Sequence, residues 1–256
     1  MKHVRASGFP CPENLIHLFI GGSELHGAKV GSTDDLDIYG VYIESPVLRL
    51  GIDTFPHFVW STAGNERRNG PDDVDLTLYS FAKLAALMAK GNPTALHFLM
   101  APNLSGRDEP WETTIRPRRA LFAARAAADK FRGFANAQLR RLKGEGTGKH
   151  GQRPEYIGKH GYDTKAAMHI IRLLNEGIEF MRTGQITLPR PEPELSTLIS
   201  IRTGEFGPLE RVLELASQKF DELASAETNS SLPAEVDRGA INRLVAQTYL
   251  GFYAQG

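Results

Sequence analysis

Two aspartates one residue apart are the feature of this sequence with the clearest chemical meaning. Asp35 and Asp37 stand at the start of segment 36–43, whose alternating, β-branched and aromatic residues predict a strand. Because side chains alternate along a strand, the two carboxylates project from one face, about 7 Å apart. Uncompensated, they would repel each other and one would take up a proton. The pair therefore predicts a cation bound beside it.

A third carboxylate, Asp75, opens the predicted strand 75–79. If this strand lies beside segment 36–43, the three acids can hold two metal ions roughly 4 Å apart, which activate an attacking oxygen and stabilise a leaving pyrophosphate. Oxygen ligands without cysteine favour Mg²⁺ or Mn²⁺, and these ions complete their shells with water or phosphate oxygens. We therefore expect phosphoryl or nucleotidyl transfer.

Neighbouring acids leave alternatives open. Asp72 and Asp73 lie in the polar loop before Asp75, and the alternative for Asp75 is a purely structural role. Asp34 competes with Asp35 only if the register of the strand shifts by one residue, which would turn its side chains to the other face. A solvated sheet edge is the interpretation of the aspartate pair that needs no metal.

The residues before the aspartates predict a phosphate-binding turn. The apolar run 15–20 stops at Gly21 and Gly22, as a buried strand entering a turn does. A turn into a helix would aim backbone N–H groups and the Ser23 hydroxyl at a triphosphate, and glycine permits its close approach. We therefore expect Gly22 and Ser23 to bind the phosphates of a nucleotide next to the metal site.

A predicted helix over 163–183 carries a polar stripe beside its apolar face. Lys165, His169, Arg172 and Glu176 form this stripe, at positions i, i+4, i+7 and i+11. We expect Lys165, His169 and Arg172 to line the cleft and to contact the triphosphate or an acceptor phosphate. The alternatives are a solvated stripe and, for His169, a hydrogen-bonded packing role.

The elements around these residues predict an α+β fold. A small sheet is expected from strands over 15–20, 36–43, 55–60 and 74–79, followed by a short helix from Phe81 and another over 95–100. Longer helices are expected over 118–142, 163–183, 208–226 and 233–253. We therefore expect an N-terminal α/β domain, residues 1–115, with its sheet flanked by helices, and a helical domain, residues 116–256, that closes the cleft.

Charge and composition limit the binding partners and the cellular location that we expect for the protein. Lys plus Arg equals Asp plus Glu, so no global positive field draws the chain to nucleic acid, but the basic segment 116–172 offers a local patch for RNA. The single cysteine, Cys11, cannot form an intramolecular disulfide. The sequence has neither the apolar core of a secretory peptide nor a membrane-spanning run. We expect a cytoplasmic protein without a membrane partner.

A segment rich in glycine and basic residues, 144–161, is expected to be a mobile loop. Its first part resembles a phosphate loop, but Lys143 stands where the first glycine would be, and His150 replaces the Ser or Thr that would bind Mg²⁺. The functional alternative is a basic lid that orders over nucleotide or RNA.

Several motifs resemble those of one protein family. Gly22-Ser23 and Asp35-Leu36-Asp37 resemble the Gly-Ser and Asp-x-Asp signature of nucleotidyltransferases of the DNA polymerase beta superfamily. Longer segments resemble the predicted nucleotidyltransferases associated with RNA repair: they are Tyr79-Ser80-Phe81-Ala82-Lys83, Lys90-Gly91-Asn92-Pro93, Gly161-Tyr162-Asp163-Thr164-Lys165, Leu188-Pro189-Arg190-Pro191 and Ile201-Arg202-Thr203-Gly204-Glu205. The resemblance covers most of residues 15–250. One departure is Thr33-Asp34, which stands where such proteins usually show Ser-Asp.

The resemblance implies a polymerase-beta-like nucleotidyltransferase fold and an RNA 3′ end as the leading acceptor. With the site residues, it leads us to expect an enzyme that moves a nucleoside monophosphate from a nucleoside triphosphate to an acceptor hydroxyl, with two Mg²⁺ or Mn²⁺ ions and release of pyrophosphate. The catalytic metal ligands would be Asp35, Asp37 and Asp75, and the nucleotide would contact Gly22, Ser23, Lys165, Arg172 and His169. The rivals are an inactive nucleotide- or RNA-binding module and an antitoxin-like regulatory protein on the same fold.

Overall fold

A four-stranded mixed sheet forms the centre of the N-terminal part of the chain. The computed structural model describes residues 1–31, 35–64, 70, 72–145 and 151–255. Its strands follow the spatial order β1-β2-β4-β3. They are β1 (Leu15–Ile20), β2 (Leu36–Tyr42), β3 (His57–Ser61) and β4 (Val74–Ser80). β2 and β4 run parallel and the other two pairs antiparallel, so all four predicted strands are confirmed, with small shifts at their ends.

The two faces of the sheet pack against different parts of the chain. On one face, Ile38 packs with Phe9 and with the N-terminal segment that includes α1 (Lys2–Ala6). On the other face, Val41 belongs to the larger apolar core that the sheet shares with the helices. Because side chains alternate along β2, Asp37 lies on the same face as Val41. The aspartates therefore point to the side of the sheet that the helices cover.

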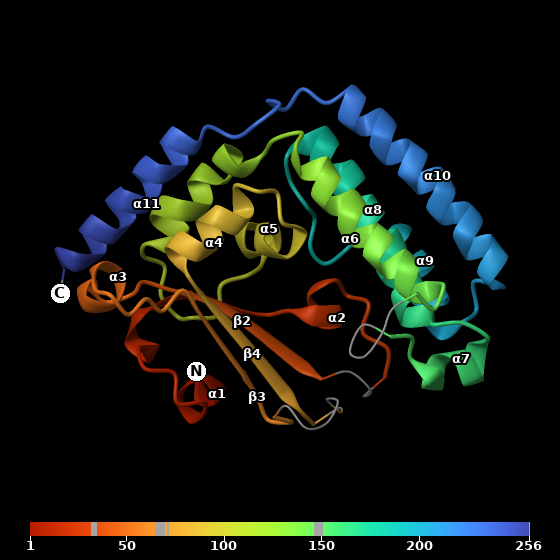
Figure 1. Ribbon diagram of the computed structural model, residues 1–256, viewed down its shortest axis with the longest axis horizontal. Helices are drawn as coiled ribbons and strands as arrows, with labels where there is room; N and C mark the ends of the chain where they lie inside the picture. Colours follow the sequence, from red (N-terminus) through yellow and green to blue (C-terminus); the bar gives the residue numbers. More distant parts are fainter. Residues whose placement is uncertain (32–34, 65–69, 71, 146–150, 256) are drawn as a thin grey trace.

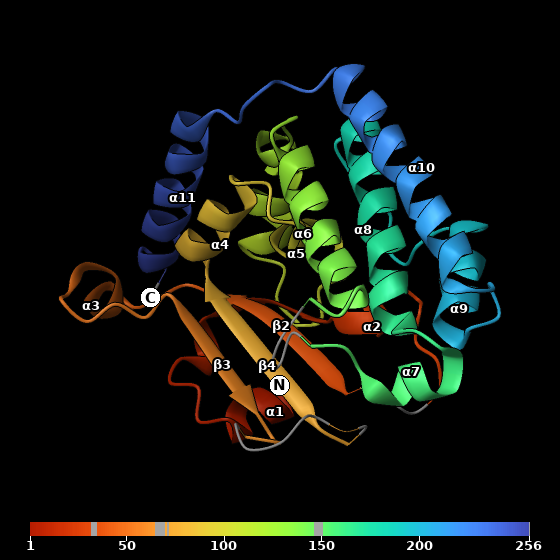
Figure 2. The same ribbon diagram turned by 45° about the vertical axis from the view of Figure 1, so that its right-hand side comes forward.

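Helices cover this second face, with α6 and α8 side by side and α10 along the outside (Figure 1), and the turned view in Figure 2 shows the same arrangement. The longer helices are α4 (Phe81–Met88), α5 (Pro93–Met100), α6 (Ala127–Leu142), α8 (Thr164–Thr183), α9 (Glu194–Thr203), α10 (Leu209–Thr228) and α11 (Arg238–Tyr253). The short ones include α2 (Gly22–Leu25), α3 (Pro46–Leu50) and α7 (Pro154–His160). The α+β fold is confirmed. Within the described ranges, no helix has the length and apolar character needed to cross a membrane.

The Lys-Gly-Asn-Pro motif positions α5 over the sheet. Gly91 adopts a positive φ of 69°, and a side chain there would overlap the backbone of Ala127 at the start of α6. Asn92 caps α5, because its Oδ1 accepts a hydrogen bond from the N–H of Ala95 at 3.1 Å, and Pro93 occupies the first helical position. The motif therefore fixes where α5 begins and how closely it approaches α6.

The predicted helix over 118–142 is wrong in its first part. The chain forms a 3₁₀ segment, η3 (Arg116–Phe122), and α6 begins only at Ala127. Between them, the N–H groups of Arg125 and Ala126 donate to the carbonyls of Pro233 and Ala234. These donors are bonded to a distant segment, so they do not continue a helix.

The predicted loop over 144–161 is wrong in its second half, where α7 lies. Pro154 stands at the first position of α7, and Gly161 ends it with a φ of 82°. Proline at the first position and a left-handed glycine at the end are typical of a helix. The prediction of a loop gave more weight to the high glycine content of the segment. Residues 146–150 lie outside the described residues, so the basic lid stays a prediction.

The C-terminal helix α11 packs back onto the N-terminal part. The Tyr249 hydroxyl donates to the buried carboxylate of Glu44 and accepts the N–H of Ala82 at 3.2 Å. The Tyr253 hydroxyl donates to the Glu44 carbonyl at 2.7 Å. The last helix therefore contacts α4 and the segment that follows β2 directly, and a domain boundary near residue 115 stays a prediction.

Burial of His17 gives the fold an expected pH dependence. The ring is fully buried and stacks on Trp111, with ring centroids 4.4 Å apart. Burial, aided by Arg116, lowers its pKa to about 3. Below about pH 6.5 the His17 ring binds a proton in the unfolded chain but not in the folded protein. The free energy of unfolding that depends on the neutral ring is therefore fully present above that pH and is lost as the pH falls. The loss amounts to about 1.4 kcal/mol at pH 5.5.

His17→Phe keeps a flat ring against Trp111. Between pH 7.5 and pH 5.5 we expect the unfolding free energy of the wild type to fall by about 1.4 kcal/mol more than that of His17→Phe. Urea unfolding at the two pH values measures the difference. His57→Phe is the control, since His57 lies exposed on the edge strand β3. Equal pH dependence in wild type and His17→Phe would contradict the expectation.

Candidate active site

Three carboxylates converge at one end of the sheet. The parallel register of β2 and β4 pairs Asp37 directly with Asp75, on strands about 4.8 Å apart. Asp35 lies just before β2, two residues from Asp37 and therefore on the same face. One carboxylate oxygen from each of the three lies within 4.8 Å of the other two. The structure thus brings together the three residues that were predicted as metal ligands.

The spacing fits a divalent cation. Oxygen ligands of Mg²⁺ lie about 2.0–2.1 Å from the ion, so two ligands of one ion are at most about 4.2 Å apart. Oxygens within 4.8 Å of one another reach that geometry by small side-chain rotations, and the set can also bridge two ions. Asp75 Oδ1 is buried and has no hydrogen-bond partner among the described residues. A buried carboxylate oxygen of this kind is costly unless a cation or a water binds it.

The charge of the cluster also affects the aromatic side chains beside it. Burial raises the pKa of the Tyr39 hydroxyl, and the negative charge of Asp37 raises it further. The pKa of Tyr79, on the neighbouring strand, is raised by burial as well. A phenol whose pKa is at or above its ordinary value of about 10 is neutral near pH 7. The Tyr39 hydroxyl, which interacts electrostatically with Asp37, Asp75 and Asp35, therefore adds no further negative charge.

Asp73 forms hydrogen bonds with residues of the loop before β4. Its Oδ1 accepts the Thr62 hydroxyl at 2.8 Å, and its Oδ2 accepts the N–H of Gly70 at 2.7 Å. These bonds hold the loop before β4, which leaves Asp75 as the acid that the sheet aligns with Asp37. Asp34, the other alternative, lies outside the described residues.

Two consecutive glycines allow the turn after β1 to lie on the carboxylate face. A side chain at Gly21 would overlap the ring of Tyr39, and one at Gly22 would overlap the carboxylate of Asp37. The N–H of Gly21 donates to the Asp37 carbonyl at 2.8 Å. Gly22 has a positive φ of 59° and starts α2, which also contains Ser23. The predicted phosphate-binding turn and the predicted metal site are therefore in direct contact.

A buried ionic cluster lies on the helical side of this turn. Glu176 on α8 is fully buried, and Arg172, one turn earlier, is 9% exposed. Arg172 Nη1 donates to both Glu176 oxygens, at 2.8 and 3.0 Å. It also lies 3.1 Å from Nε2 of His26, at the end of α2. His97 on α5 completes the cluster, with its Nε2 3.0 Å from Glu176 Oε2.

Charges in this cluster compensate one another. Burial alone would raise the pKa of Glu176, but Arg172 and the two histidines hold it well below its ordinary value. Burial and the charge of Arg172 lower the pKa of His26 to about 3. Near pH 7 the cluster therefore contains an ionised Arg172, an ionised Glu176 and a neutral His26. The positive charge expected from Arg172 is present, but an adjacent negative charge offsets it.

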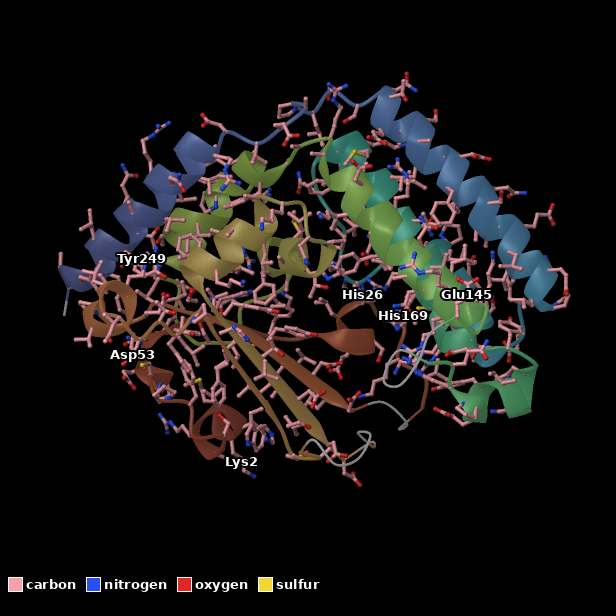
Figure 3. The ribbon with its side chains drawn as sticks, viewed as in Figure 1. Lys2, His26, Asp53, Glu145, His169 and Tyr249 are labelled. Atoms are coloured by element: carbon pink, nitrogen blue, oxygen red, sulfur yellow. The ribbon has the colours of Figure 1, made fainter. Side chains whose placement is uncertain are left out.

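The other two residues of the stripe lie closer to the start of α8. His169 is half-buried, and burial together with Arg172 and Lys165 lowers its pKa well below the ordinary value. Figure 3 shows His169 and His26 close together, between α2 and α8. His169 is therefore a neutral group near His26. Lys165 lies one helical turn before it and is also half-buried.

A small pocket of about 100 Å³ opens behind the Gly21-Gly22 turn. Its floor is aromatic and its walls come from β1, β2, α2, α5 and α8. The lining residues are Phe19, Gly21, Gly22, Leu25, His26, Tyr39, Thr94, His97 and Arg172. Arg172 thus lines the same pocket as Gly21 and Gly22 and is buried, and its contact with a triphosphate stays a prediction.

Sequence reasoning missed the roles of His26 and His97. His26 stands within the Gly-Gly-Ser-Glu-Leu-His-Gly segment, and nothing in its spacing shows that it meets α8. Glu176 was noted only as the last residue of a polar stripe. Its position four residues after Arg172 was the available signal, because i,i+4 partners lie on one face of a helix.

Comparison with known proteins gives the family of this chain. The profile of the RNA repair pathway DNA polymerase beta family matches residues 2–247, so the chain belongs to this family. A solved structure of a nucleotidyltransferase-like protein from Exiguobacterium sibiricum 255-15 aligns with 88% of this chain and 72% of its own, with 11% identity and a TM-score of 0.31. Among curated proteins there is no match.

Contact between Gly22 and Asp37 can be tested by adding a single methyl group. We expect Gly22→Ala to weaken Mn²⁺ binding by about tenfold or more, a loss of about 1.4 kcal/mol, because Asp37 or the turn must move. Titration with Mn²⁺, followed by the electron paramagnetic resonance of the free ion, measures the affinity.

Gly8→Ala is the matched control. Gly8 also has a positive φ, 75°, but a side chain there would meet open space. This variant carries the backbone strain of alanine at positive φ, about 1–2 kcal/mol, without any overlap at the site. Unchanged Mn²⁺ binding in Gly22→Ala, or an equal loss in both variants, would contradict the assigned contact.

Proposed function

We propose that this protein is a metal-dependent nucleotidyltransferase that moves a nucleoside monophosphate from a nucleoside triphosphate to an acceptor hydroxyl and releases pyrophosphate. The observation that carries the proposal is the convergence of Asp35, Asp37 and Asp75, with Asp37 directly against Gly22. A carboxylate cluster next to a glycine turn suits a substrate that brings both phosphates and a divalent cation.

Divalent cations bound by Asp35, Asp37 and Asp75 would activate the attacking hydroxyl and neutralise charge on the phosphates. The residues of the chain would mainly position the substrate. Gly22 and Ser23 would hold the phosphates through backbone N–H groups and the Ser23 hydroxyl, because both begin α2. The aspartates would direct these phosphates to one end of the sheet, where the acceptor must also arrive.

Arg172, Lys165 and His169 would act from α8. Arg172 lines the pocket that Gly21 and Gly22 also line, so it is the side chain best placed to stabilise negative charge near the turn. Lys165, one helical turn before His169 on α8, would add positive charge. His169, whose pKa is lowered well below the ordinary value, would contribute a neutral ring that donates or accepts a hydrogen bond.

For the acceptor we propose an RNA end, on the strength of the family to which the chain belongs. The basic segment 116–172 would contact its backbone, although part of the charge is engaged within the protein. Arg141 and Arg153 lie 3.8 and 3.2 Å from the buried Asp163, and Arg132 contacts Asp129. RNA binding would therefore depend on the remaining basic side chains. The lone cysteine, Cys11, suits a reducing compartment such as the cytoplasm.

Removing the carboxylate charge should abolish the reaction. We expect the double variant Asp35→Asn, Asp37→Asn to lower transfer of label from an α-labelled triphosphate to RNA by more than about a hundredfold, because metal-ion stabilisation of the transferred charge is worth several kcal/mol. The assay uses each of the four nucleoside triphosphates with total RNA, in Mg²⁺ or Mn²⁺, and circular dichroism verifies the fold.

Asp53→Asn is the matched control, because Asp53 lies exposed near α3 (Figure 3), and it should transfer label at the wild-type rate. Wild-type labelling in the double variant would refute the proposed reaction. A wild-type protein that binds a triphosphate with metal but releases no pyrophosphate with any acceptor would favour an inactive binding module. Purification from its native host in a stable stoichiometric complex would favour an antitoxin-like partner protein.

A further inference from the structure

The buried cluster of His26, His97, Arg172 and Glu176, which we call the Glu176 cluster, joins three elements beside the active site. Glu176 and Arg172 come from α8, His26 ends α2, and His97 lies on α5. A carboxylate with this degree of burial is expensive to ionise unless several donors surround it. Arg172 Nη1 at 2.8 Å and His97 Nε2 at 3.0 Å form hydrogen bonds with Glu176, and His26 Nδ1 lies 3.1 Å away without hydrogen-bond geometry.

Two histidines and a glutamate also form a donor set suited to zinc, and their ligand atoms lie within 4.8 Å of one another. In this cluster, however, a protein cation already stands between them. Arg172 Nη1 is within 3.1 Å of both Glu176 oxygens and of His26 Nε2. A dication would have to displace the guanidinium or share the site with it. The contacts therefore favour a fixed arginine over a second metal ion.

Arg172 also determines the state of the His26 ring. A guanidinium nitrogen can only donate, so His26 Nε2 accepts from Arg172 Nη1, and the ring proton stands on Nδ1. Nδ1 lies 3.1 Å from Glu176 Oε1. His26 thus contacts two residues of one helix through its ring nitrogens, with a hydrogen bond at Nε2 and a close approach at Nδ1. Its carbonyl is held as well, because it accepts the N–H of Arg190 at 3.1 Å.

His26 lies four residues after Gly22, at the other end of the single-turn helix α2. Such a short helix has little rigidity of its own, since one turn contains few internal hydrogen bonds. Its place is therefore determined by its two ends. At the first end, Gly22 lies against Asp37, and at the second end His26 is held by Glu176 and Arg172. A shift of His26 is transmitted to Gly22 over one turn of backbone.

We propose that Glu176 is a positioning residue that keeps the Gly21-Gly22 turn in place over Asp37. It does so through its contacts with His26 and Arg172. The site can then bind a triphosphate together with a divalent cation. This inference rests on the proposed function and extends it to a residue that touches neither the metal ligands nor the turn. The helical part of the chain thereby contributes to phosphate binding through a buried charge.

The first test replaces the charge and keeps the shape. In Glu176→Gln, the affinity for Mn²⁺ with inorganic tripolyphosphate should fall by about tenfold, which corresponds to about 1.4 kcal/mol. Glu222→Gln is the matched control, because Glu222 is a half-buried carboxylate on α10 that pairs with Arg182 and Lys219. It should bind like the wild type. Tighter binding in Glu176→Gln would mean that Glu176 competes with phosphate for Arg172, and would overturn the proposal.

The second test separates positioning from packing. His26→Asn keeps an N–H donor near the place of Nδ1, whereas His26→Gln keeps more of the side-chain volume but reaches the place of Nε2. Positioning through Glu176 acts on Nδ1, the ring nitrogen 3.1 Å from Glu176 Oε1, so the asparagine variant should bind Mn²⁺-tripolyphosphate more tightly than the glutamine variant. A packing role requires volume and gives the opposite order. That opposite order would refute the proposal even if Glu176→Gln does not fold.

Amide signals in the ligand-free protein distinguish failure of this inference from failure of the proposed function. Nuclear magnetic resonance of the full chain should show that Glu176→Gln shifts the side-chain nitrogens of His26 and His97 and also the amides of Gly21 and Gly22. Shifted histidines with unchanged glycine amides would refute positioning and leave the proposed function intact. A wild type that binds no Mn²⁺-tripolyphosphate would refute the proposed function, whereas the glycine amides would still decide whether Glu176 holds the turn.

Discussion

Repulsion between carboxylates that the sheet forces together is the constraint on which the rest of the structure depends. The parallel pairing of β2 with β4 sets Asp37 beside Asp75, and alternation along β2 adds Asp35 to the same face. Such an arrangement is unfavourable in a folded protein unless a cation offsets it. The sheet therefore gathers three carboxylates at one end, where a divalent cation bound with a phosphate-bearing substrate would offset their charge.

Elements around this end of the sheet are shaped to leave room and to avoid further negative charge. Gly21 and Gly22 are required because a side chain at either position would overlap Tyr39 or Asp37. The Tyr39 phenol beside the acids is neutral near pH 7, and burial together with Asp37 raises its pKa further. On the opposite side of the turn, Arg172 supplies positive charge that Glu176 offsets, so its position is fixed without leaving an unpaired charge in the core.

Much of this site could be predicted because its chemistry is local in the sequence. Alternating residues predicted β2, the run 74–79 predicted β4, and convergence of Asp35, Asp37 and Asp75 was expected if the two strands lay side by side. The Glu176 cluster could not be predicted in the same way, because its members lie far apart in the sequence and meet only through tertiary packing. The break before α6 was missed for a similar reason, since the N–H groups of Arg125 and Ala126 are bonded to residues more than a hundred positions away. By contrast, α7 was missed although Pro154 and Gly161 mark its ends, because the glycine content of its surroundings was given more weight.

The central claim, that Asp35, Asp37 and Asp75 together hold divalent cations, is tested most directly by locating the ions. A crystal of the full chain soaked in Mn²⁺ and a non-hydrolysable nucleoside triphosphate analogue, with anomalous scattering recorded at the manganese edge, shows where the metal binds. We expect one or two anomalous peaks between the three carboxylates, next to the Gly22 turn. Carboxylates turned apart with no peak between them, or manganese bound instead at His26, His97 and Glu176, would contradict it.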